Sequence, residues 1–156
     1  MGYIAVVLAQ TVVLPVVFGL ATLASHDTWA IAGTFGRWFL FWGVGSRLVL
    51  AGVVQIVKPE FTTESILGGS PQAGANQVAQ ELGFADLAMG IGGCVGTFLG
   101  GGLAAAITGG LYMGIAGMRH VVKRDANVRE QVATWTDLLV FATMIAYAAA
   151  VIVRGP

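Results

Sequence analysis

A single arginine in the middle of a long apolar stretch most constrains how this chain can fold. The stretch runs from Trp38 to Val57 and carries Arg47 as its one formal charge. About 20 helical residues, rising 1.5 Å each, match the roughly 30 Å hydrocarbon core of a bilayer. A guanidinium at that depth is costly, so we expect it to face a bundle interior or a watery cavity and to have an acidic partner.

The composition indicates an integral membrane protein. Of the 156 residues, 56% are hydrophobic and 10% are charged, whereas a soluble domain usually carries about 25% charged residues. Eight basic residues balance eight acidic ones, which leaves no net positive charge to attract nucleic acid. We therefore predict a single all-α domain over residues 1–156, with the lipid bilayer as its surroundings.

Hydrophobic runs predict a bundle of about five membrane-spanning helices, with a four-helix core as the alternative. The predicted spans are residues 3–24, 35–57, 78–99, 103–122 and 135–153.

The distribution of Lys and Arg predicts the orientation, because cytoplasmic loops carry more of them. One side collects more basic residues than the other, which has Arg37 and Arg154. The richer side holds Lys58, Arg119, Lys123, Arg124 and Arg129. We predict a multi-pass protein of the inner (plasma) membrane, with a cytoplasmic N-terminus and an external C-terminus.

Small residues recur every four positions in the predicted third and fourth spans. They are Gly92, Gly96 and Gly100 in the third span and Ala106, Gly110 and Gly114 in the fourth. Such seams let helix backbones approach closely, so we predict a tightly packed hairpin of these two spans. A homo-oligomer interface, or close approach to a bound pigment, lipid or quinone, is the open alternative.

Arg47 is predicted to pair with Asp86 or Glu81, two carboxylates that also lie inside an apolar stretch. Asp86 shares a helix face with Gly90 and Gly93, whereas Glu81 lies about 140° around the same helix. One guanidinium is therefore not expected to meet both acids head-on. Secondary members of this polar cluster are predicted to be Gln55, Gln77, His120 and Asp137.

Two interpretations of the cluster stay open. In the first, Arg47 and an acid form a buried pair that fixes the register of two helices. In the second, the cluster lines an inward-facing vestibule that binds a cation, a proton or a polar ligand.

The sequence predicts neither a catalytic site nor a metal site. Cys94 is the only cysteine, and His, Asp and Glu do not cluster at metal-ligand spacing. His120 is predicted to cap a helix end or to lie among lipid headgroups, and His26 lies on the opposite side of the membrane. No cofactor is predicted, although a bound lipid, quinone or pigment is not excluded.

The segment Glu81–Gly90, ELGFADLAMG, resembles part of an uncharacterised family of small bacterial multi-pass membrane proteins. Phe39–Pro59 and Gly117–His120 contribute to the resemblance. Asp86 departs from it, because Asn is usual there. More distantly, the architecture is similar to the four-helix DoxX-like proteins. The resemblance implies a helical membrane bundle and transfers no established activity.

Three functional hypotheses follow. The leading one is a non-enzymatic accessory or structural subunit, which packs into a larger membrane assembly or associates with itself. The alternative is a small transporter, or a proton- or ion-handling protein, that uses Arg47, Glu81 and Asp86. The third is a DoxX-like role in quinone-linked redox chemistry.

Overall fold

The computed structural model describes residues 2–25, 31–66, 73–122 and 126–154, and these form helices and no strand. The first two long helices each contain a π-helical segment. The first consists of α1 (Gly2–Leu8), η1 (Ala9–Val13) and α2 (Leu14–Ser25), and the second of α3 (Ile31–Trp38), η2 (Phe39–Ser46) and α4 (Arg47–Val57). After them come η3 (Phe61–Ile66), α5 (Ala73–Leu99), α6 (Gly102–Val121) and α7 (Val128–Arg154).

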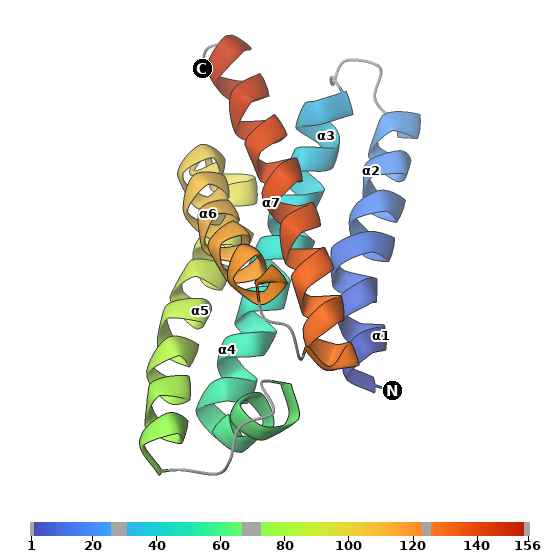
Figure 1. Ribbon diagram of the computed structural model, residues 1–156. Helices are drawn as coiled ribbons and strands as arrows, with labels where there is room; N and C mark the ends of the chain where they lie inside the picture. Colours follow the sequence, from blue (N-terminus) through green and yellow to red (C-terminus); the bar gives the residue numbers. More distant parts are fainter. Residues whose placement is uncertain (1, 26–30, 67–72, 123–125, 155–156) are drawn as a thin grey trace.

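The long helices stand side by side in one bundle (Figure 1). The N-terminus and the start of α7 lie at one end of this bundle, and the C-terminus lies at the other. The second long helix packs chiefly on α5, and α6 packs chiefly on α7.

Among the described residues, four helices are long and apolar enough to cross a membrane. They are Gly2–Ser25, Ile31–Val57, Gly74–Leu99 and Val128–Val153. Their length and composition indicate a membrane protein. The prediction of five spans is not confirmed, because α6 is helical but is not among the four. Helix α6 is long enough, but its glycines, together with Arg119 and His120, keep the mean hydropathy of every 18-residue stretch of it below that of the four candidate spans.

Helix α7 begins earlier than the predicted span at residue 135. Asn127 caps it, because its Oδ1 accepts hydrogen bonds from the backbone nitrogens of Arg129 and Glu130, at 2.9 and 3.1 Å. This early start places Asp137 about 14 Å along the helix from Val128, deeper than the predicted boundary implied.

The π-helical segments η1 and η2 lie next to residues that interrupt or follow the regular helix. Pro15 lacks the N–H that would bond to the carbonyl of Thr11, and the helix widens into η1 just before the proline. Segment η2 ends directly before Arg47 and contains Gly43 and Gly45. Such segments often occur at functional sites in helices, and this one sets the direction in which Arg47 leaves the backbone.

Glycines bring the second long helix into direct backbone contact with α5. A Cβ atom on Gly90 would lie 2.5 Å from the backbone nitrogen of Val49, and one on Gly52 would lie 2.6 Å from the carbonyl oxygen of Gly83. Asp86 is buried on the same face of α5 as Gly90, as the helical spacing predicts. Only glycine permits this approach, because any side chain would meet backbone atoms.

The predicted seam of α5 against α6 is not found along the glycines that were expected to form it. A Cβ on Gly92 would have no neighbour within 4 Å. Gly96 approaches Gly101 and Ala105 close to the turn, and Gly100 forms the turn itself with a φ of 88°. The two helices therefore touch at the turn, and Gly92 faces open space.

The small residues of α6 face α7 instead. A Cβ on Gly110 would lie 2.7 Å from the Cβ of Met144, and one on Gly114 would lie 2.6 Å from the ring of Phe141. Ala106 is buried in the same core. The glycines of α6 receive the large side chains of α7, which explains why sequence periodicity alone assigned the wrong partner helix.

The apolar core lies between the second long helix, α6 and α7. It consists of Phe39, Leu40, Val44, Leu48, Ala106, Met113, Val140, Met144 and Tyr147.

The substitution Gly90→Ala is expected to lower the free energy of unfolding by about 1–3 kcal/mol, because the added methyl group meets backbone atoms that have no room to move. Gly92→Ala on the same helix is the matched control and should cause no loss, since its Cβ would enter open space. Unfolding in mixed micelles of a non-ionic detergent and dodecyl sulfate measures both changes. Equal stability of the two variants would contradict the glycine contact.

Candidate functional site

An ion pair in the interior of the bundle joins the second long helix to α7. Nη2 of Arg47 lies 2.6 Å from Oδ1 of Asp137, and the two side chains are only 10% and 11% exposed. Arg47 is thus buried and paired with a carboxylate, as the membrane argument requires. The partner, however, is neither of the two primary candidates predicted from the sequence.

Glu81 lies outside this cluster. It is exposed, and its Oε1 accepts a hydrogen bond from Nε2 of Gln77 at 3.2 Å. Gln77 is exposed as well. Both residues lie on an exposed part of α5, in agreement with the angle of about 140° that separates Glu81 from the buried Asp86. The prediction that Glu81 and Gln77 belong to the buried cluster is wrong.

Asp86 does belong to the cluster, although not as the direct partner of Arg47. Its residue is 2% exposed, and it lies close enough to Asp137 and Arg47 for their charges to act on it. The side chains of Tyr112 and Gln55 direct polar groups towards its carboxylate. Its Oδ1 still has no hydrogen-bond partner among the described residues.

These groups line a cavity of about 720 Å³. Every long helix of the described chain contributes to its wall, as does η3. Its polar side chains include Gln10, Arg47, Gln55, Asp86, Tyr112 and Asp137, and its apolar side chains include Leu48, Val54, Leu82, Met113 and Ile115. The cavity therefore has a polar centre and hydrocarbon walls.

Segment η3 borders the cavity through Phe61, and its neighbours hold it in place. Nδ2 of Asn127 donates to the carbonyl of Ile66 at 2.7 Å, and the guanidinium of Arg129 lies 5.7 Å from the ring centroid of Phe61. The ring of Tyr3 meets Phe61 edge-on, with centroids 5.9 Å apart. The start of α7 and the start of α1 thus fix one rim of the cavity.

His120 lies at the end of α6 and pairs with Glu130 at the start of α7. Nδ1 of His120 is 2.8 Å from Oε1 of Glu130, which is fully buried. His120 borders the cavity, and its contact with Glu130 connects the end of α6 to the start of α7. The predicted counterpart on the other side, His26, lies outside the described residues.

Sequence reasoning missed Gln10, Tyr112 and Glu130. Nε2 of Gln10 donates to Oγ of Ser46 at 2.8 Å, which links the first two long helices. Tyr112 was detectable, because it lies one helical turn before Ala116 and two turns before His120, on one face of the same helix. Glu130 gave no such signal, since its burial depends on where α7 begins.

The charges of the site do not cancel when all three buried groups are ionised. Arg47 and Asp137 compensate each other, and Asp86 adds a further negative charge. Three buried polar atoms in the cluster have no hydrogen-bond partner among the described residues: Nη1 of Arg47, Oε1 of Gln55 and Oδ1 of Asp86. Among all the residues that the structure describes, there is no group of three or more His, Cys, Asp or Glu side chains that could hold a metal ion.

Removal of one partner of the ion pair is expected to destabilise the fold strongly. Asp137→Leu leaves the guanidinium of Arg47 buried without compensation, at a cost of about 3–5 kcal/mol. The double variant Arg47→Leu with Asp137→Leu should recover most of this loss, because both charges are then absent. Detergent-micelle unfolding of the two single variants and the double variant gives the coupling energy.

The control for this cycle is Arg47→Leu with Asp86→Leu, which leaves Asp137 buried without its cation. It should remain destabilised. Recovery in the control but not with Asp137→Leu would assign the pairing to the wrong carboxylate.

A family model covers almost the whole chain, from residue 5 to residue 153. No curated protein and no solved structure matches the chain. The family match agrees with the resemblance to an uncharacterised family, whereas the similarity to DoxX-like proteins and the bacterial origin remain predictions. The chain belongs to DUF6790, a family of unknown function.

Proposed function

We propose that the protein binds a small amphipathic molecule in the cavity, as a membrane carrier or transporter built around the Arg47–Asp137 pair and Asp86. The observation that carries this proposal is the buried carboxylate of Asp86, which borders the cavity and keeps one oxygen unpartnered. An ionisable group inside a membrane helix usually marks a substrate or ion pathway.

The size and chemistry of the cavity support a small organic ligand. Its volume of about 720 Å³ falls within the range of about 300–1,000 Å³ that is typical of small-molecule sites. Such sites are mostly apolar and carry a few convergent polar groups. Leu48, Met113 and Ile115 supply apolar wall, while Gln55, Asp86 and Tyr112 supply the polar groups.

The proposal includes an orientation. We place α6 across the membrane as a fifth span, which puts the N-terminus in the cytoplasm and the C-terminus outside. The polar centre then opens towards the cytoplasmic half, bordered by the exposed Arg119. Two of the basic residues behind this orientation, Lys123 and Arg124, lie outside the described residues.

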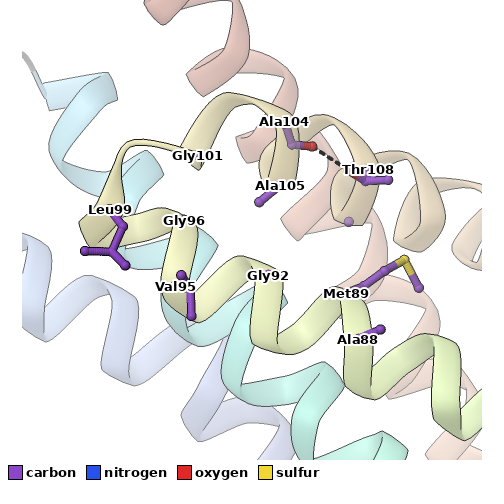
Figure 2. A pocket seen from close by; sticks show the side chains of 11 residues that line it. Ala88, Met89, Gly92, Val95, Gly96, Leu99, Gly101, Ala104, Ala105 and Thr108 are labelled. Atoms are coloured by element: carbon purple, nitrogen blue, oxygen red, sulfur yellow. Dashed lines mark hydrogen bonds between the residues drawn. The ribbon is translucent and has the colours of Figure 1, made fainter.

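A second candidate function is that of an accessory subunit or a homo-oligomer, and a groove between α5 and α6 favours it. Figure 2 shows this groove, where small residues of both helices face one another across open space and Thr108 bonds back to the carbonyl of Ala104. It has a volume of about 550 Å³ and includes Gly92 and Gly96. Small residues let a helix of another subunit approach closely in a bilayer.

The quinone-linked role gains no specific support from the described residues. The cavity would admit a quinone by size, and no observed side chain favours that headgroup over others.

The cavity proposal is tested by filling the cavity. Wild-type protein transferred directly from membranes into lipid nanodiscs should carry a bound small molecule that native mass spectrometry detects. Ala116→Phe should remove it, because the ring occupies the space beside Tyr112. Ala104→Phe is the matched control, since it adds the same ring on the same helix but in the groove of Figure 2. A wild type without any adduct, or an adduct retained in Ala116→Phe, contradicts the proposal.

The accessory or oligomer proposal is tested at Gly92. Gly92→Leu fills the groove and should abolish a complex that wild-type protein forms in mild detergent, while the monomer stays folded. Ala146→Leu, at an exposed position of α7 outside the groove, should leave the complex intact. Light scattering coupled to size-exclusion chromatography reads the mass. If the wild-type protein elutes as a monomer without a partner protein, this function is excluded.

A further inference from the structure

We infer that the ligand of the cavity carries a cationic head group, so that it is an amphipathic amine whose nitrogen meets Asp86. This inference rests on the proposed function and specifies the chemistry of its ligand. It is carried by charge balance, by the unpartnered atoms of the cluster and by the size of the cavity.

One additional positive charge would balance the charges of the buried cluster. Arg47 and Asp137 form a compensated pair, and an ionised Asp86 remains as an additional carboxylate at 2% exposure. A buried charge is stable only when an opposite charge and hydrogen bonds compensate it. Arg119 does not provide this compensation, because it lies exposed at the border of the cavity.

Two of the three unpartnered atoms of the cluster are hydrogen-bond acceptors, which a ligand with hydrogen-bond donors would satisfy. Oδ1 of Asp86 and Oε1 of Gln55 are both acceptors, and both lack a partner among the described residues. An ammonium group offers up to three donors and no acceptor, so its hydrogen-bonding chemistry matches that of the two oxygens. The remaining unpartnered atom, Nη1 of Arg47, would donate a hydrogen bond to a hydroxyl or carbonyl oxygen of the same ligand. A carboxylate or phosphate head would instead meet Asp86 with like charge.

The cavity offers far more space than an inorganic cation or a proton occupies. A water molecule takes about 30 Å³ of liquid volume, whereas the cavity holds about 720 Å³. Most of the remaining wall is hydrocarbon, including Leu48, Val54 and Met113. These side chains would surround an apolar tail, and the amine would sit at the polar centre.

The experiment compares three probes that share one tail: dodecylamine, dodecanol and dodecanoate, each titrated into the protein in a non-ionic detergent at pH 7. Dodecylamine is protonated at this pH, since alkyl amines such as the lysine side chain titrate near pH 10. We expect wild-type protein to bind dodecylamine more tightly than the other two. Asp86→Asn should weaken the binding of dodecylamine about 10- to 100-fold, because a neutral amide replaces the charged carboxylate that accepts the hydrogen bond of the ammonium group. The same substitution should leave the affinity for dodecanol unchanged.

Two controls separate this inference from the proposed function. Glu81→Gln removes an exposed carboxylate from the same helix and should bind dodecylamine like the wild type. Ala116→Phe fills the cavity and should abolish binding of every probe. If dodecanol binds as tightly as dodecylamine and only Ala116→Phe matters, the cationic head group is wrong and the cavity remains a ligand site. If no probe binds wild-type protein, or Ala116→Phe retains binding, the ligand site itself is wrong. Should Asp86→Asn fail to fold, the ranking of the three probes on the wild type decides the question.

Discussion

The burial of one guanidinium inside an apolar bundle is the constraint on which the rest of the structure depends. Arg47 leaves the backbone directly after η2 and meets Asp137 of α7 at 2.6 Å. The same two helices supply most of the apolar core around Val44 and Met144. The ion pair therefore connects two helices that are remote in sequence, beside the apolar core that the same helices form.

Two kinds of packing surround this pair and leave the cavity between them. On one side, Gly52 and Gly90 bring the second long helix and α5 into backbone contact. On the other, Gly110 and Gly114 of α6 receive the side chains of α7. Helices α5 and α6 approach each other most closely near their turn, and further from it both contribute side chains to the wall of the cavity. Asp86 stands where this space reaches the ion pair.

The features that could be predicted were those that depend on local sequence. The long helices, the burial of Arg47, and the separation of Asp86 from Glu81 around α5 all follow from hydrophobic runs and helical periodicity. The pairing of Arg47 could not be predicted in this way. It depends on where α7 begins, which Asn127 sets, and on how α7 is rotated against the second long helix. The seam of α6 was assigned to the wrong neighbour for the same reason.

The sequence by itself determined that this chain forms apolar helices of membrane-spanning length and that its few ionisable side chains must be satisfied inside them. Helix length and amphipathic faces are local properties, and the cost of a charge in hydrocarbon does not depend on the fold. Only the tertiary structure decided that Asp137 compensates Arg47, that Asp86 is left beside a cavity, and that Glu81 faces outward. These outcomes depend on the relative rotation, depth and start of separate helices, which no single helix specifies.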